Sequence, residues 1–273
     1  MTLINGIETD HLPINDRGLQ YGDGLFETIE ISDGRPVFLD RHLQRLVKGC
    51  IALAIPTPDS AILIEEIQRV CRESPQAVLK IIITRGNGGR GYRLPQAVNP
   101  TRIISLHPFP EYPADYAEHG INARFCETRL GLNPALAGLK HLNRLEQVLA
   151  RSEWNNDSCQ EGIMQDANGY VIEGTMTNLF YLKNDHLYTS SLQLCGIAGI
   201  IRDIVMHLAT SRQMPLIEHD YDKAELLSAD SVFVCNSVIG IWPIKQLEGV
   251  QFAVSQTIKE LQRALTDFKT SGQ

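Results

Sequence analysis

The sequence has no long hydrophobic run, and this lack argues against a membrane-spanning segment. Apolar stretches such as those within residues 77–83, which Lys80 interrupts, are short, whereas a helix needs roughly 20 apolar residues to cross a bilayer. The first residues also lack a basic start followed by an apolar stretch. We therefore expect no secretory signal and a cytoplasmic location.

Closely spaced cysteines and common hydrolase motifs are missing as well. The six cysteines are widely separated and form no C-x-x-C pair, so reduced, mostly buried thiols are expected rather than a zinc site. Neither a G-x-S-x-G turn nor an H-E-x-x-H pair occurs. Serine-hydrolase and zinc-protease chemistry therefore have no residues to support them.

The chain also lacks an excess of positive charge. Its net charge is −7 at pH 7, which argues against a general nucleic-acid or membrane-surface binder, because both favour a basic face. The charge leaves room for a local basic pocket that takes an acidic small molecule. With 273 residues, 43% of them hydrophobic, the chain is long enough for two packed units.

Strand and helix patterns alternate along the chain and predict an α/β or α+β fold. A tight turn at residues 33–34 joins a strand at 25–31 to a return strand at 36–39, and Asp40 is a plausible helix N-cap. Further strands are expected at 78–84, 102–107, 121–126 and 231–235, hairpin turns at 168–169 and 184–185, and helices at 60–72, 139–152, 200–212 and after residue 254.

A proline-rich stretch marks the expected domain boundary. Residues 108–113 contain three prolines, which resist both helix and sheet. We therefore predict an N-terminal α/β domain at 1–107, a linker at 108–120 and a C-terminal domain at 121–273.

Two local features suggest chemistry. Residues 195–199 are rich in glycine and directly precede a predicted amphipathic helix, so backbone N–H groups there could bind a phosphate; a plain structural turn is the commoner outcome. Lys140 is expected at the start of a helix with apolar neighbours. An amine kept partly out of water has a lowered pKa and can attack a carbonyl carbon, although a lysine that reaches the surface is more usual.

Three further features leave alternatives open. Glu173 ends a strand-like stretch and is either a buried acid facing a cation or an exposed turn residue. Arg45 shares a helix face with Arg41 and Lys48, for which a solvated basic face is the ordinary interpretation. Residues 85–92 form a loop rich in glycine and arginine that either wraps an anionic ligand or connects two strands flexibly.

Several segments together resemble the fold-type-IV pyridoxal-phosphate family, which includes branched-chain and D-amino-acid aminotransferases. Residues 16–27 resemble its N-terminal block, 42–46 its phosphate-arginine helix, and 173–180 and 196–199 two more blocks. The resemblance runs in order through nearly the whole chain. It implies a smaller N-terminal α/β domain, a larger C-terminal domain with a pseudo-barrel sheet, and a homodimer.

The resemblance also implies roles for single residues. Lys140 would form a Schiff base with pyridoxal phosphate and later move protons, and Glu173 would keep the pyridine nitrogen protonated. The implied ligands of the cofactor phosphate are Arg45, the backbone of Ile197 and Ala198, and a polar group from Asn236 or Ser237. Related aminotransferases usually carry a threonine where Ala198 stands, so one hydroxyl contact to the phosphate is missing here.

Within the family, residues 85–92 and 139–149 favour the lyases over the transaminases. A lyase would use Lys140 as a base and then as an acid, which needs an amine with a pKa near neutral. Arg90 and Tyr92 are candidates for binding substrate carboxylates. A D-amino-acid or branched-chain transaminase is the nearest alternative, and a ligand-binding protein without catalysis is the alternative from another class.

Overall fold

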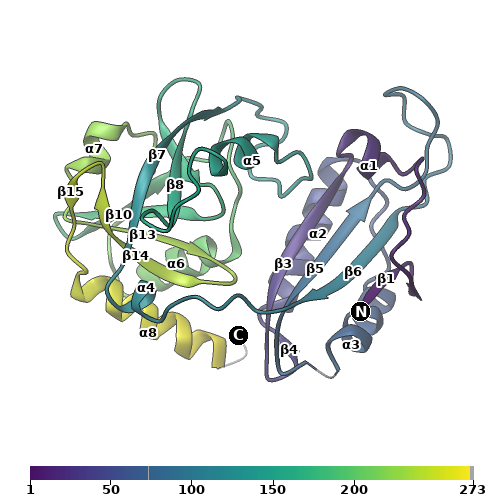
Figure 1. The fold of residues 1–273 in the computed structure, drawn as a ribbon, viewed down its shortest axis with the longest axis horizontal. Helices are drawn as coiled ribbons and strands as arrows, with labels where there is room; N and C mark the ends of the chain where they lie inside the picture. Colours follow the sequence, from purple (N-terminus) through teal and green to yellow (C-terminus); the bar gives the residue numbers. More distant parts are fainter. Residues whose placement is uncertain (73, 271–273) are drawn as a thin grey trace. The chain divides into compact units, whose positions relative to one another are not determined.

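The computed structural model describes residues 1–72 and 74–270, and the chain forms two compact units (Figure 1). Unit 1 comprises Met1–Pro110 together with Lys140–Asn143, and unit 2 comprises Glu111–Leu139 and the chain from Arg144 onward. The chain leaves unit 1 inside the proline-rich stretch. The last three residues of the expected C-terminal domain, 271–273, lie outside the described residues.

Unit 1 is a six-stranded sheet with the strand order β2-β1-β6-β5-β3-β4. Its strands are β1 (Thr2–Ile4), β2 (Ile7–Glu8), β3 (Gly24–Ser32), β4 (Arg35–Pro36), β5 (Gln76–Thr84) and β6 (Thr101–His107). Its helices are α1 (Arg17–Tyr21), α2 (Leu39–Ala52) and α3 (Ser60–Cys71). The inward side chains of β3 and β5 pack with Leu46 of α2 and Ile67 of α3 in one apolar core. This packing confirms the strand and helix patterns that the sequence shows over these segments.

The connection between β3 and α2 differs from the prediction. The turn at Asp33-Gly34 is confirmed, and both residues have positive φ angles, of 50° and 73°, as a two-residue hairpin turn requires. The predicted return strand ends at Pro36, however, because Phe38 adopts a left-handed conformation that takes the chain out of the sheet. The prediction of Asp40 as N-cap is therefore wrong: the helix begins at Leu39, and Asp40 lies in its first turn.

The helix predicted for residues 139–152 is also shorter than expected, because it begins only at Leu145 (α5, Leu145–Arg151). The residues before it pair with β3 instead. The N–H of Phe26 donates to the carbonyl of Lys140 at 2.9 Å, and the N–H of Leu142 donates to the carbonyl of Gly24 at 3.0 Å. A carbonyl that accepts from a strand is not available to a helix ladder, so Lys140 lies on an extended segment along the edge of β3.

Unit 2 contains a sheet that closes on itself. Its strands are β7 (Ile121–Leu130), β8 (Glu161–Asp166), β9 (Val171–Gly174), β10 (Asn178–Lys183), β11 (His186–Ser190), β12 (Leu216–His219), β13 (Ser231–Asn236), β14 (Gly240–Leu247) and β15 (Val250–Gln251). The ring runs β10-β13-β14-β7-β8-β9 and returns to β10 where Asn178 pairs with Glu173. This closure confirms the predicted pseudo-barrel.

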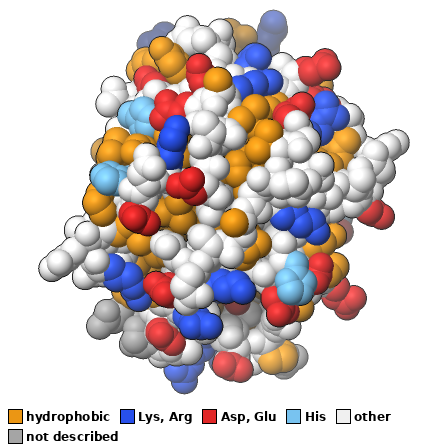
Figure 2. Space-filling view, turned by 90° about the vertical axis from the view of Figure 1, so that its left-hand side faces the viewer, with side chains coloured by type: hydrophobic (Ala, Val, Ile, Leu, Met, Phe, Trp, Pro, Cys, Tyr) orange, Lys and Arg blue, Asp and Glu red, His pale blue; other side chains and the backbone are white. Residues whose placement is uncertain are grey.

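Helices surround parts of this barrel. They are α4 (Asp115–Glu118), α5, α6 (Ile200–Ser211), α7 (Lys223–Leu227) and α8 (Gln256–Thr270). Figure 2 shows one face of unit 2, on which acidic and basic side chains are interspersed with small apolar areas. Among the helices of residues 1–72 and 74–270, none has the length and apolar composition needed to span a membrane.

Candidate active site

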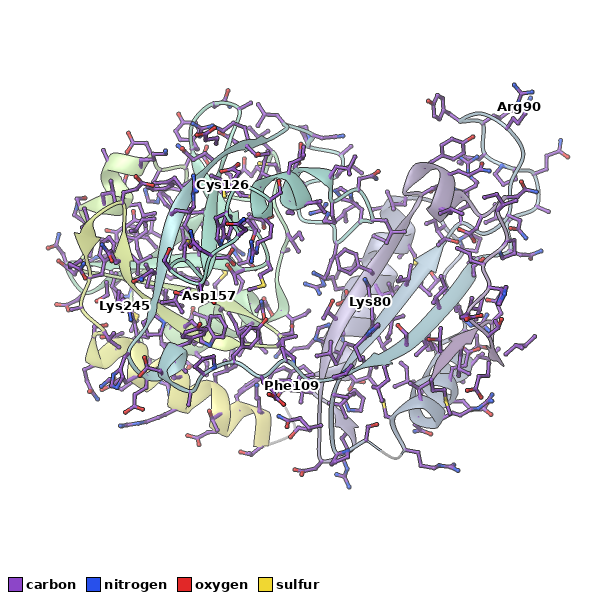
Figure 3. All side chains as sticks on the ribbon, viewed as in Figure 1. Lys80, Arg90, Phe109, Cys126, Asp157 and Lys245 are labelled. Carbon is purple, nitrogen blue, oxygen red and sulfur yellow. The ribbon has the colours of Figure 1, made fainter. Side chains whose placement is uncertain are left out.

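Lys140 lies over an aromatic ring of unit 1. Its side chain is half-buried, and Nζ lies 4.4 Å from the centre of the Phe26 ring. The Nζ of Lys80, which Figure 3 labels in the sheet, lies 5.6 Å from the same ring. A cation over the face of an aromatic ring is attracted to it. The hydrogen bond from the Phe26 N–H to the Lys140 carbonyl holds the two segments that carry these side chains next to each other.

Arg45 belongs to a buried network and not to a solvated face, so that alternative is wrong. Its guanidinium donates two hydrogen bonds to Glu27, from Nε to Oε1 at 2.8 Å and from Nη2 to Oε2 at 2.5 Å. The ring of His42 lies at the same carboxylate, with Nδ1 2.6 Å from Oε2. Both Glu27 and His42 are at most 1% exposed.

The charges of this network follow from its surroundings. Burial by itself would raise the pKa of Glu27, but the hydrogen bonds and charges of Arg45 and His42 lower it to about 2. Burial lowers the pKa of His42, and its contact with Glu27 only partly offsets this effect. At neutral pH, Glu27 is therefore anionic and His42 is neutral.

Glu173 is buried in unit 2, at 3% exposure, so the exposed-turn alternative is wrong. Its Oε2 accepts a hydrogen bond from the N–H of Ile197 at 2.8 Å. Asn178, which pairs with Glu173 across the closure of the barrel, donates from Nδ2 to the carbonyl of Ile197 at 2.8 Å. The closing strands therefore hold the carboxylate and the glycine-rich loop together.

The loop at residues 196–199 leads directly into α6. Gly196 has a φ of +86°, which favours glycine, and a Cβ on Gly199 would lie 2.0 Å from Oδ1 of Asn178. The N–H of Ala198 donates to the carbonyl of Gly138 at 3.1 Å, while the N–H of Ile197 is taken by Glu173. The predicted backbone donors thus already make hydrogen bonds within unit 2, next to the positive end of a twelve-residue helix.

Asn236 and Ser237 lie at the same end of the barrel. Asn236 is the last residue of β13, one position beyond the Cys235 that pairs with Asn178. The Asn236 side chain accepts from the N–H groups of Val238 and Ile239 and donates to the carbonyl of Met176. Its amide therefore shapes the turn after β13, and half-buried Ser237 follows directly.

Arg144 is a neighbour of this region that the sequence analysis did not single out. It lies in unit 2, just after the segment that carries Lys140. Burial lowers its pKa, and the charges of Glu173 and Glu146 oppose that effect. The half-buried guanidinium of Arg144 therefore lies close enough to interact electrostatically with the Glu173 carboxylate.

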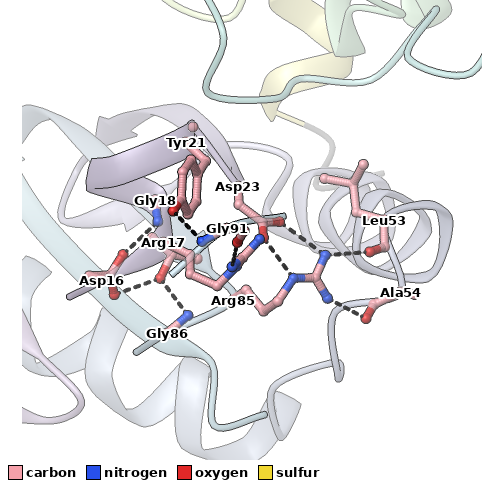
Figure 4. Close-up of polar contacts among 12 residues, drawn as sticks. Asp16, Arg17, Gly18, Tyr21, Asp23, Leu53, Ala54, Arg85, Gly86 and Gly91 are labelled. Carbon is pink, nitrogen blue, oxygen red and sulfur yellow. Dashed lines mark hydrogen bonds and ion pairs between the residues drawn. The ribbon is translucent and has the colours of Figure 1, made fainter. Parts of the chain in front are cut away.

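The loop at residues 85–92 is anchored to unit 1 rather than being a loose connection (Figure 4). Arg85 is 3% exposed and donates to Asp23 and to the carbonyls of Leu53 and Ala54. Arg17 donates to Asp23 and to the carbonyl of Gly91. Arg85 therefore caps the end of α2, and its guanidinium is occupied by Asp23 and two backbone carbonyls.

The tip of this loop carries the two expected substrate residues. Arg90 is exposed, and Figure 3 shows it at the outer end of the loop. Tyr92 is 86% exposed, and its ring packs edge-on against Tyr21 with the ring centres 5.6 Å apart.

One sequence signal could have revealed the network around Arg45. The side chains of Leu25, Ile29 and Ile31 alternate along β3 and point into the core. Glu27 occupies the same face at the same period of two. A carboxylate at a core position is rarely buried without a partner, so this position predicts a buried cation nearby.

The side chains present fit pyridoxal phosphate chemically. The cofactor has an aldehyde, a pyridine nitrogen and a phosphate, which require an amine, a carboxylate and cationic or N–H donors. Unit 1 supplies a half-buried lysine and a rigidly held arginine. Unit 2 supplies a buried carboxylate beside a helix N-terminus. Groups of these chemical kinds are the ones that bind a carbonyl compound and move protons at carbon.

The family model of the class IV amino-transferases matches residues 24–247. The chain belongs to this family. The class IV aminotransferases depend on pyridoxal phosphate, and the match includes the segments that carry Arg45, Lys140, Glu173 and the loop at 196–199.

Individual class IV proteins agree with this assignment. The aminodeoxychorismate lyase of Vibrio harveyi is 36% identical over 97% of this chain and 98% of its own. The solved structure of 4-amino-4-deoxychorismate lyase from Pseudomonas aeruginosa is 43% identical, covers 98% of each chain and has a TM-score of 0.94. The branched-chain amino acid aminotransferase of Escherichia coli is 27% identical over 99% of this chain and 95% of its own, with a TM-score of 0.87. These likenesses confirm the predicted fold class.

Proposed function

We propose that the protein is a pyridoxal-phosphate-dependent lyase that converts 4-amino-4-deoxychorismate into 4-aminobenzoate and pyruvate, a step of folate biosynthesis. The observation that carries this proposal is the likeness to two lyases over nearly the whole chain, at 36% and 43% identity. The branched-chain aminotransferase shares the fold at 27% identity. The half-buried amine of Lys140 is the proton carrier that such an elimination needs.

The residues proposed to hold the cofactor are those that the family resemblance implies. Lys140 would bind its aldehyde carbon and Glu173 would hold a proton at its pyridine nitrogen. Arg45 would bind the phosphate, together with the loop at Ile197 and Ala198 and with Asn236 or Ser237. The N–H groups of Ile197 and Ala198 would exchange their present partners for phosphate oxygens. When bound, the cofactor supplies an electron sink for the carbon that loses its proton.

Lys140 would then move one proton between two atoms of the substrate. It would take the proton from C4, which starts the loss of enolpyruvate and makes the ring aromatic. It would give a proton to the methylene carbon of the departing enolpyruvate, so that pyruvate leaves. The backbone pairing with β3 and the contact with Phe26 restrict the positions that Nζ can occupy.

We also propose that Arg90 and Tyr92 bind substrate carboxylates. Both side chains are exposed on an anchored loop, and a guanidinium can pair with a carboxylate through two hydrogen bonds. A homodimer and a cytoplasmic location complete the proposal. They rest on the family resemblance and on the sequence.

A pyruvate-release assay with 4-amino-4-deoxychorismate tests the proposal. We expect pyruvate and 4-aminobenzoate to form in equal amounts without any amino acceptor. The Lys140→Ala variant should form neither product. Activity that requires 2-oxoglutarate would instead support a D-amino-acid or branched-chain transaminase, which the likeness to the Escherichia coli aminotransferase favours. A colourless protein that borohydride leaves unchanged would support a binding protein without catalysis.

A further inference from the structure

A buried carboxylate lies behind Arg45, and the proposed chemistry does not use it. Glu27 lies on the inward face of β3, and its side chain is 1% exposed. The guanidinium of Arg45 reaches both of its oxygens, at 2.8 Å and 2.5 Å. Two parallel hydrogen bonds of this kind fix the plane of a guanidinium as well as its position.

His42 supports the same carboxylate from within the core. It lies three residues before Arg45 on α2, is fully buried, and places Nδ1 2.6 Å from Oε2 of Glu27. Because Glu27 is anionic, Nδ1 carries the proton and donates it. The opposite ring nitrogen, Nε2, is buried without a hydrogen-bond partner among residues 1–72 and 74–270. Glu27 therefore accepts three hydrogen bonds from two side chains of one helix.

We propose that Glu27 is a positioning residue for Arg45, which it holds in the orientation that binds the cofactor phosphate. The inference rests on the proposed function, because the phosphate is the group that Arg45 would bind. An arginine side chain has many rotamers, and a site that fixes one of them in advance loses less freedom when the ligand arrives. Glu27 thus raises phosphate affinity without touching the cofactor.

Paired titrations with pyridoxal phosphate and pyridoxal test this role, because pyridoxal lacks the phosphate. Absorbance titration of the cofactor-free wild type and of Glu27→Gln gives the dissociation constants of both ligands. We expect Glu27→Gln to weaken pyridoxal phosphate binding by about 10- to 100-fold, the range for losing a hydrogen bond to a charged group. Pyridoxal affinity should stay at the wild-type value.

Two further variants show whether Glu27 acts through Arg45. Arg45→Gln should lower phosphate-dependent affinity to a similar extent, and combining it with Glu27→Gln should add little more, because both changes remove one interaction. Glu27→Asp keeps the charge but shortens the side chain. It should give the same selective loss, and it serves as the second variant if Glu27→Gln does not fold.

Glu66→Gln is the matched control. Glu66 is another buried carboxylate of unit 1. It accepts hydrogen bonds from Arg102, from Nε to Oε2 at 3.0 Å and from Nη2 to Oε1 at 2.6 Å. Glu66→Gln should lower thermal stability and leave the ratio of the affinities for pyridoxal phosphate and pyridoxal unchanged. If Glu27→Gln lost affinity equally for pyridoxal phosphate and pyridoxal, or lost affinity for neither, the inference would be overturned. Failure of the wild type itself to bind pyridoxal phosphate would instead overturn the proposed function.

Discussion

The candidate residues of unit 1 meet on two neighbouring positions of β3. Lys140 lies over Phe26, and Arg45 is bound to Glu27, the next residue along the strand. Two successive residues of one strand therefore position both an amine and a guanidinium, and the charge of Lys140 acts on His42, which contacts the same Glu27 carboxylate. Small shifts of this stretch would displace both groups together.

The buried Glu27 carboxylate should make stability depend on pH. Its pKa falls from 4.5 to about 2 on folding, so the ionised form stabilises the native state by about 3 kcal/mol at neutral pH. The contribution is complete above pH 4.5 and is lost as pH falls from there toward 2, because only the unfolded chain then takes up the proton. Urea unfolding of wild type and Glu27→Gln should therefore show a larger difference in unfolding free energy at pH 7 than at pH 3. A difference that stays constant or grows toward pH 3 would contradict this assignment.

At the scale of elements, the closure of the barrel determines where the candidate residues of unit 2 lie. The pairing of Glu173 with Asn178 joins β9 to β10, and Asn178 in turn holds the loop that precedes α6. The turn after β13, shaped by Asn236, lies at the same end. A buried carboxylate and a helix N-terminus are thereby held next to each other by strand pairing rather than by a flexible loop.

The fit of Gly199 against Asn178 can be tested by substitution. Gly199 has a φ of −72°, which alanine adopts readily, but its Cβ would lie 2.0 Å from Oδ1 of Asn178. We expect Gly199→Ala to displace the Asn178 amide, lower the free energy of unfolding by roughly 1–3 kcal/mol, and weaken pyridoxal phosphate binding. Gly89→Ala is the control, because its Cβ would meet nothing within 4 Å. Equal effects of the two substitutions in thermal unfolding would show that the loop tolerates a side chain.

At the scale of the whole molecule, the segment Lys140–Asn143 packs in unit 1 although the chain on both sides belongs to unit 2. Periodicity along the sequence predicted most strands and helices correctly, because each buries one face locally. The same periodicity wrongly predicted a helix from residue 139. It carries no signal of the pairing between Lys140 and Phe26, because these residues lie far apart in the chain. Pairings between distant residues are set by tertiary packing and not by local pattern.

In the candidate site, too, the sequence predicted single residues but not the distant partners that hold them. Family resemblance singled out Lys140, Arg45 and Glu173. Arg45 is a partly buried ion-pair partner of Glu27, and Glu173 is a buried carboxylate. The partners that hold them, Glu27 and Asn178, were not singled out, because each acts through another residue. The loop at residues 85–92 left two alternatives open, and its Arg85 binds Asp23; an arginine in a loop has the same sequence signature whether it binds a ligand or a neighbouring carboxylate.

Borohydride reduction followed by peptide mapping tests most directly whether Lys140 carries the cofactor. The protein is incubated with pyridoxal phosphate, reduced, digested and analysed by mass spectrometry, with Lys140→Ala and Lys80→Ala treated in parallel. Lys80 is the matched control, because its amine lies beside the same Phe26 ring. We predict the mass of the reduced cofactor on the peptide that contains Lys140 in the wild type and in Lys80→Ala, and none in Lys140→Ala. A label on the Lys80 peptide, or one that persists in Lys140→Ala, would contradict the assignment of Lys140.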